Sequence, residues 1–351
     1  MTARATRDRV RTRVLTGLID NRLSRRLAGP PATIDGRTID PAFGVLCRLA
    51  TWATPSGEPD PTRMRRDLER LQAVGPARHG EVHVTDRYAP GPAGAVPVRI
   101  YRPAGIEEPA PAVVYLHGGG WVCGSVRGMD VPCHNLATDT ASVVVSVDYR
   151  LAPEHPYPAA VEDSVAAYRW VHGAAGSLGI RPDRIAVMGD SAGGNLAAIV
   201  AQQLRGADVD PPVAQGLVYP VTDMLQSSAS YRSVGTGFVL EASTMEWFRR
   251  LYVPDPSHWT SPLASPLAAV DLADLPPALV ATAGFDPLRD EGIAYAEALR
   301  AAGNQVIEIH EPDLIHGYYD IGVVRRAVEA SAAINRRMAE LLRPVAAVDL
   351  R

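Results

Sequence analysis

The sequence contains one segment suited to nucleophilic catalysis, at residues 189–193. It reads Gly-Asp-Ser-Ala-Gly, follows the apolar run 185–188 and precedes the helix-prone stretch 194–201. A serine on a sharp strand-to-helix turn needs glycine two positions before and after it, because the turn leaves little space around the backbone. The helix that follows directs its amides and the positive end of its dipole toward the hydroxyl. This pattern predicts that Ser191 is a nucleophile.

A second segment could stabilise the negative charge that forms when a serine attacks a carbonyl group. Residues 117–121 read His-Gly-Gly-Gly-Trp and follow the apolar run 113–116. Three successive glycines cost backbone entropy, on the order of 1 kcal/mol each relative to alanine, which indicates that their geometry is needed. We expect the N–H groups of Gly119, Gly120 and Ala192 to form an oxyanion hole. Four residues are expected to support the site structurally: His117, Gly118, Asp190 and Asp290.

An acid and a base are expected later in the chain, because this kind of turn is followed in chain order by Asp or Glu and then His. Asp286 stands at the end of an apolar run, where side chains of parallel sheets gather at a common edge, and Asp290 lies one helical turn further on. His316 is followed by glycine in a loop, whereas His310 belongs to a strand-like run. We therefore predict Asp286 and His316 as the partners of Ser191.

Short apolar runs alternate with helix-like stretches and supply the elements that would position these residues. Eight strands are expected, at residues 81–88, 95–101, 112–116, 142–147, 184–188, 215–219, 278–283 and 305–309. The first two should form an antiparallel hairpin. The others are nearly continuous Val, Ile and Leu runs, which is typical of strands buried on both faces and joined by parallel crossovers. The fold class is therefore α/β, with a mostly parallel sheet.

Two segments fall outside this alternation and are predicted to roof the site. Residues 1–75 are rich in arginine, helical in pattern and broken by prolines, with Asp60 and Pro61 marking the start of one helix. Residues 222–260 are inserted after the sixth strand, in a catalytic domain that spans residues 76–351. Six residues are predicted to wall the substrate pocket: Trp121, Phe238, Trp247, Phe248, Tyr252 and Tyr318.

Composition excludes several kinds of chemistry and partner. The chain has 351 residues and no lysine, so phosphate-binding loops and Schiff-base mechanisms that need an amine are ruled out. Its net charge of −4 disfavours nucleic acid as a partner. Three cysteines form no metal-binding or disulfide pattern, which favours a reducing, cytoplasmic setting. No apolar run is long enough for a membrane span, and no metal-ligand group is predicted.

These motifs resemble those of the bacterial hormone-sensitive-lipase-like carboxylesterases, which have the α/β-hydrolase fold. The resemblance covers roughly residues 80–342 and includes H-G-G-G, G-D-S-A-G-G, the run Asp-Tyr-Arg-Leu-Ala-Pro-Glu at 148–154 and Asp-Pro-Leu-Arg-Asp at 286–290. One departure is Tyr318, where the family usually has phenylalanine. That change is expected to alter the pocket wall or to add a hydrogen bond, and it leaves the three reacting groups intact.

The resemblance implies hydrolysis of short- to medium-chain acyl esters, with a small-molecule ester as substrate and no cofactor. An amide or lactone hydrolase, or an acyl transferase, would use the same acylated serine and stays open from sequence. A non-catalytic small-molecule receptor on this fold is a remote alternative, since such a protein should lack one of the three reacting groups. The sequence leaves open whether the chain is a monomer or a homodimer.

Overall fold

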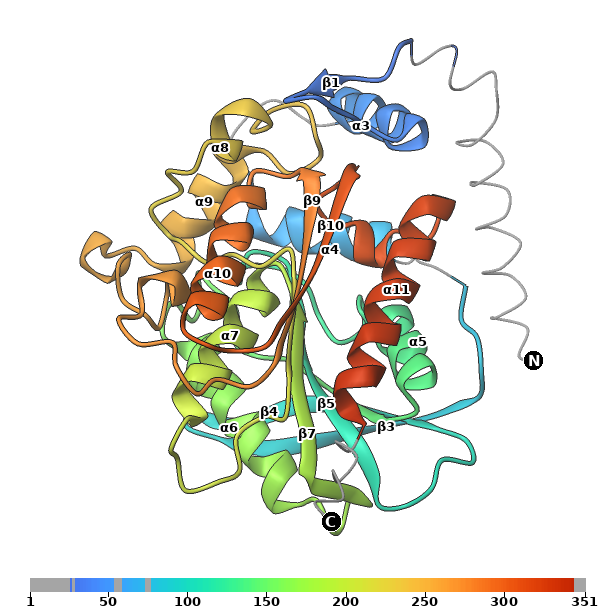
Figure 1. Cartoon of the computed structure of the whole chain (residues 1–351), viewed down its shortest axis with the longest axis vertical. Helices are drawn as coiled ribbons and strands as arrows, with labels where there is room; N and C mark the ends of the chain where they lie inside the picture. The colour runs from blue at the N-terminus through green and yellow to red at the C-terminus, as the bar shows by residue number, and fades with distance from the viewer. Residues whose placement is uncertain (1–25, 27–28, 54–58, 73–76, 344–351) are drawn as a thin grey trace, which may run out of the picture.

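A central sheet of eight strands organises the molecule, in a computed structural model that describes residues 26, 29–53, 59–72 and 77–343 (Figure 1). The strands are β3 (Val82–Gly91), β4 (Gly94–Pro103), β5 (Ala110–Leu116), β6 (Val143–Val147), β7 (Ile180–Asp190), β8 (Gln215–Val218), β9 (Ala278–Phe285) and β10 (Val306–Ile315). They lie in the order β10-β9-β8-β7-β5-β6-β4-β3. Each predicted strand has its counterpart, so the predicted α/β fold is confirmed.

Strand direction in the sheet follows from how the strands are connected. The pairs β3–β4 and β4–β6 are antiparallel, and the first of these is the predicted hairpin. All pairings from β6 through β5, β7, β8 and β9 to β10 are parallel. The carboxyl ends of the parallel strands therefore meet along one edge, where ligands and reacting groups gather in open α/β sheets.

Helices cover both faces of the sheet. One face carries α6 (Ala159–Gly173), α7 (Ala192–Leu204) and α10 (Arg289–Ala301), and the other carries α5 (Asp130–Thr140) and α11 (Arg325–Leu342) (Figure 1). Alternate side chains of a strand point to opposite faces. Val114 and Leu116 of β5 accordingly belong to one core cluster, and Val113 and Tyr115 to the other. Both faces are therefore fully packed around the central strands.

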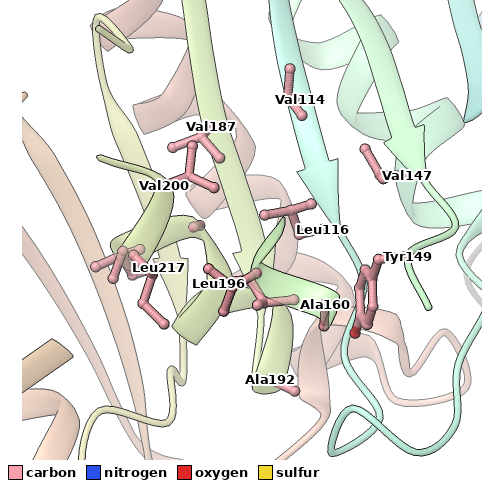
Figure 2. Packing of buried hydrophobic residues seen from close by; sticks show 14 of the residues in the cluster. Val114, Leu116, Val147, Tyr149, Ala160, Val187, Ala192, Leu196, Val200 and Leu217 are labelled. Atoms are coloured by element: carbon pink, nitrogen blue, oxygen red, sulfur yellow. The ribbon is translucent and has the colours of Figure 1, made fainter. Parts of the chain in front are cut away.

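Helix α7 is held firmly against the sheet. Its Leu196 and Val200 belong to the same buried cluster as Val187 of β7 and Leu217 of β8 (Figure 2). All four side chains are at most 1% exposed. Burying an aliphatic side chain of this kind contributes roughly 1.5–3 kcal/mol. This packing fixes the first turn of α7, which begins immediately after Ser191.

The described part of the N-terminal segment forms a small hairpin and two helices. These are β1 (Thr33–Ile34), β2 (Arg37–Thr38), α3 (Pro41–Ala53) and α4 (Pro61–Gln72). Helix α4 starts where the sequence predicted, with Asp60 Oδ2 accepting the N–H of Arg63 at 2.7 Å. The segment is tied to the sheet edge, since the N–H of Asp40 donates to the carbonyl oxygen of Asp313 at 2.9 Å. Residues 1–25, the start of the segment predicted to be helical in pattern, lie outside the described residues.

The long connection between β8 and β9 carries α8 (Ser230–Ser233), α9 (Ala242–Tyr252) and the short turns η1 (Pro256–His258) and η2 (Pro266–Ala268). Helix α9 supplies Trp247, Phe248 and Tyr252, which are all buried. The last short turn, η3 (Tyr318–Asp320), lies between β10 and α11. None of the helices in the described ranges has the length and apolarity needed to cross a membrane.

Candidate active site

Ser191 occupies a strained turn between β7 and α7. Its φ and ψ angles are 54° and −117°, a conformation that L-residues other than glycine rarely adopt. The flanking glycines are required by close approach: a Cβ on Gly193 would lie 1.9 Å from the carbonyl oxygen of Leu116, and one on Gly189 would lie 2.3 Å from that of Gly193. The local sequence thus permits a turn that no larger residue at these two positions would allow.

His316 connects Ser191 with a buried carboxylate. Nε2 of His316 lies 3.0 Å from Oγ of Ser191, and Nδ1 lies 2.8 Å from Oδ2 of Asp286. Asp286 is fully buried, and its Oδ1 accepts the N–H of Leu288 at 2.8 Å. His316 is in the loop that follows β10, and Gly317 with a φ of 81° provides the turn after it. The arrangement has the geometry of a nucleophile, a base and an orienting acid.

The other candidates for base and acid lie elsewhere in the structure. Nδ1 of His310 lies 2.9 Å from Oγ1 of Thr282 on the neighbouring strand. Asp290 accepts the N–H of Ser230 at 2.8 Å and pairs with Arg289 at 2.7 Å. These contacts tie Asp290 to the inserted segment and to the start of α10.

The glycine loop after β5 adopts a conformation that only glycine accepts easily. Gly119 and Gly120 have φ angles of 119° and 60°. A Cβ on Gly119 would lie 2.2 Å from the carbonyl oxygen of Cys123, and one on Gly120 would lie 2.3 Å from the ring of Phe248. Ala192 is the first residue of α7, where N–H groups have no acceptor within the helix. These backbone groups are therefore suited to receive an oxyanion.

Comparison with known proteins agrees with this fold. A family model described as the α/β-hydrolase fold matches residues 113–320. This chain belongs to the α/β-hydrolase family. Carboxylic ester hydrolase LipN of Mycobacterium tuberculosis is 42% identical over 303 residues, covering 84% of this chain and 80% of LipN. Carboxylesterase NlhH of the same species is 40% identical over 316 residues, covering 89% of this chain and 98% of NlhH.

Solved structures give the same family. The ester-hydrolase EH1AB1 from the metagenome of Lake Arreo, solved in complex with a bipyridine phosphonate derivative, superimposes with a TM-score of 0.80 at 38% identity. The match covers 87% of this chain and 98% of EH1AB1. The hormone-sensitive-lipase-like resemblance is thus confirmed at the level of sequence and fold.

His117 is buried at the base of the glycine loop of this α/β-hydrolase. It is fully buried, its Nδ1 lies 2.8 Å from the carbonyl oxygen of Gly118, and its ring stacks on that of Tyr149 with centroids 4.3 Å apart. Burial lowers the pKa of His117, which keeps the ring uncharged. The Tyr149 hydroxyl donates to the carbonyl oxygen of His117 at 2.6 Å. The histidine therefore fills and braces the base of the glycine loop.

Asp190 joins the serine turn to the glycine loop. Its Oδ1 accepts the N–H of Gly118 at 2.9 Å and the hydroxyl of Tyr115 at 2.7 Å. Burial, together with the nearby charge of Asp320, raises the pKa of Asp190 to about 7. A Cβ on Gly118 would lie 2.2 Å from Oδ2 of Asp190, so this contact requires glycine.

The predicted pocket residues divide between two places. Trp121 stacks on Tyr252, with ring centroids 4.4 Å apart, and the ring centroids of Trp247 and Phe248 are 5.3 Å apart. These four residues belong to the core cluster on the α7 side of the sheet. The ring of Phe248 contacts the glycine loop at Gly120. The remaining two, Phe238 and Tyr318, belong to the opposite cluster. Phe238 also lines a cavity of about 270 Å³ together with residues 29–32 and 47–48.

Tyr219 is a site residue that sequence reasoning missed. Its ring centroid lies 4.5 Å from that of His316 and 5.3 Å from that of Tyr318. It is nearly fully buried, with a φ of 35°, and burial raises the pKa of its hydroxyl well above the usual value. In the sequence it reads only as the last residue of a strand. Its place at the carboxyl end of a parallel strand was the available signal.

Proposed function

We propose that this chain is a serine carboxylesterase in which Ser191, Asp286 and His316 are the catalytic triad, and that it hydrolyses short- to medium-chain acyl esters. The carrying observation is that His316 lies within hydrogen-bonding distance of Ser191 on one ring nitrogen and of Asp286 on the other. LipN and NlhH, which are named as a carboxylic ester hydrolase and a carboxylesterase, support ester rather than amide or lactone substrates.

The proposed reaction proceeds through an acylated serine. Nε2 of His316 accepts the Ser191 proton while Oγ forms a bond to the ester carbonyl carbon, and the resulting oxyanion is bound by the N–H groups of Gly119, Gly120 and Ala192. The tetrahedral intermediate then expels the alcohol, which takes the proton from His316. Water, deprotonated by the same nitrogen, attacks the acyl group and releases the acid with Ser191 restored.

Asp286 assists by orientation and by charge. Its position at Nδ1 of His316 selects the tautomer whose Nε2 carries the lone pair, and its carboxylate stabilises the imidazolium that forms during each step. The fold holds the acid in place because Leu288 occupies its other oxygen. The chemistry requires no metal or organic cofactor.

The acyl pocket is proposed to lie under the inserted segment 222–260 and the N-terminal segment 1–75. Support comes from Phe248, whose ring contacts Gly120 in the loop proposed to bind the oxyanion. An apolar wall so close to the reacting carbonyl favours a closed site of limited length.

The three cysteines, Cys47, Cys123 and Cys133, are buried and form no disulfide, which supports a cytoplasmic location. A monomer and a homodimer both stay open as oligomeric states.

Replacement of the nucleophile tests the proposed triad. Ser191→Ala should lower the hydrolysis of p-nitrophenyl butanoate by a factor of thousands or more, because covalent catalysis is lost, while thermal unfolding stays like that of the wild type. An alkyl phosphonate should add its mass to the peptide that contains Ser191 in the wild type and to none in the variant. Labelling of another serine would overturn the assignment.

A further inference from the structure

The loop proposed to bind the oxyanion has a conformation that its surroundings must maintain. Gly119, Gly120 and Trp121 have successive φ angles of 119°, 60° and 59°. Positive φ is accessible to glycine but strained for a residue as bulky as tryptophan. Strained backbone persists only where neighbouring groups hold it in place. The groups that contact this loop therefore determine whether its N–H groups are correctly placed.

Arg65, on the N-terminal helix α4, is one of these groups. Its Nε donates to the carbonyl oxygen of Val122 at 2.8 Å, and its Nη2 donates to that of Ala152 at 2.9 Å. The N–H of Ala152 in turn donates to the carbonyl oxygen of Trp121 at 2.9 Å. The guanidinium group of Arg65 thus holds Val122 directly. It holds the strained Trp121 through Ala152.

Two bonds to Glu154 set the orientation of this guanidinium group. Nη1 and Nη2 of Arg65 lie 2.8 and 2.6 Å from the two carboxylate oxygens of Glu154. This contact lowers the pKa of Glu154 to about 2. The Glu154 side chain is 54% exposed, and exposed ion pairs contribute little to stability. The pair therefore matters chiefly because it fixes the plane in which Arg65 donates to the two carbonyl groups.

The geometry points to Arg65 as a positioning residue that holds the oxyanion loop in its strained conformation from the N-terminal helix. This inference rests on the proposed function and deepens it. It gives α4 a part in transition-state stabilisation in addition to covering the pocket. A lysine could keep the charge but not this arrangement, since a single ammonium group lacks the planar fork that serves both carbonyls and Glu154.

Two substitutions of Arg65 test the inference. Arg65→Met removes every donor and keeps an apolar stem, and Arg65→Lys keeps the charge. The matched control is Arg63→Met on the same helix, because the Arg63 side chain is 54% exposed and its ion pair is with Asp67 at 3.5 Å. For each protein, kcat and KM for p-nitrophenyl butanoate are measured per active site, with sites counted by phosphonate labelling taken to completion.

Both Arg65 variants should show a kcat per labelled site about 10- to 100-fold below that of the wild type, with KM changed less than threefold. This is smaller than the roughly 10²- to 10³-fold effect of losing an oxyanion donor, because the donors remain and only their placement loosens. Binding of a trifluoromethyl ketone, which forms a tetrahedral oxyanion on the serine, should weaken by a similar factor. Arg63→Met should match the wild type in all three measurements.

A merely structural role for Arg65 would lower the unfolding temperature and leave kcat per labelled site and ketone binding unchanged. That result in either variant would overturn the inference, and Arg65→Lys alone decides if Arg65→Met does not fold. Failure of the proposed function looks different, since the wild type itself would then not be labelled at Ser191. Normal labelling with unchanged turnover in the Arg65 variants would refute only the positioning role.

Discussion

The carboxylate of Asp286 offers the sharpest perturbation of the proposed mechanism, because both of its oxygens have defined partners. Oδ1 accepts the N–H of Leu288 at 2.8 Å, and Oδ2 lies 2.8 Å from Nδ1 of His316. In Asp286→Asn the amide oxygen must stay with Leu288, so the NH₂ group faces Nδ1. That nitrogen then has to be an acceptor, and the ring proton moves to Nε2, 3.0 Å from Oγ of Ser191.

A histidine in this tautomer cannot accept the serine proton. We expect kcat to fall by about 10³ to 10⁴, equivalent to roughly 4 to 5 kcal/mol of lost transition-state stabilisation. KM should change little, because Asp286 is fully buried behind the histidine. Stability should stay near that of the wild type, since the bond to Leu288 is retained.

The assay is steady-state hydrolysis of p-nitrophenyl butanoate, with urea unfolding as a check on the fold. Asp290→Asn is the matched comparison, because Asp290 bonds to Ser230 and Arg289 instead of the histidine. It should cost much less activity than Asp286→Asn. A larger loss in Asp290→Asn, or a wild-type kcat in Asp286→Asn, would refute the assigned acid.

Three further outcomes are expected. Across p-nitrophenyl esters of two to sixteen acyl carbons, kcat/KM should rise about fourfold per methylene, from roughly 0.8 kcal/mol each, peak at four to eight carbons and then fall; a continuous rise to sixteen would contradict a closed pocket. Asp190 keeps its proton in the folded state up to about pH 7, whereas an unfolded carboxyl ionises near pH 4. The contribution of Asp190 to the free energy of unfolding is therefore present at low pH and lost as pH rises from about 4 to 7. Urea unfolding at pH 5 and 7 should show a smaller loss of stability between the two pH values for Asp190→Asn than for the wild type. An equal loss in both proteins would exclude Asp190 as its source. Deletion of residues 1–75 should abolish activity or cause aggregation, because it removes Phe43, which is fully buried, and exposes the apolar side chains of the core cluster that Phe43 covers. Full activity of the shortened chain would show that the segment is no cap.

Structural features that are determined by residues close together in the sequence could be predicted. The strand, the sharp turn and the helix around Ser191 are all set by neighbours within a dozen residues, and the same holds for the glycine loop. His316 was distinguished from His310 by a following glycine, which in the structure has a φ of 81°. Local patterning sufficed wherever the backbone itself demands a residue type.

Features that depend on partners distant in sequence could not be predicted. In the sequence, Arg65 belongs to the polar face of a predicted helix. The carbonyl groups that accept its hydrogen bonds, those of Val122 and Ala152, lie 57 and 87 residues further along the chain. Tyr219 reads as a strand residue, although its positive φ and its place beside His316 arise from packing between strand ends. Helix α3 was not delimited, because its stretch is apolar over most of its length and shows no clear polar face. The places of Arg65 and Tyr219 are decided by tertiary contacts, which no local pattern encodes.

The order of the strands in the sheet also has a consequence for when activity appears during folding. Ser191 and His316 are 125 residues apart in the chain. The histidine follows β10, which is the last strand in the described part of the chain and lies at one edge of the sheet. Contacts of such sequence separation form late in folding, because loop closure costs entropy before any packing compensates for it. During refolding, hydrolysis should therefore appear only once β10 has paired with β9 and His316 has reached Ser191.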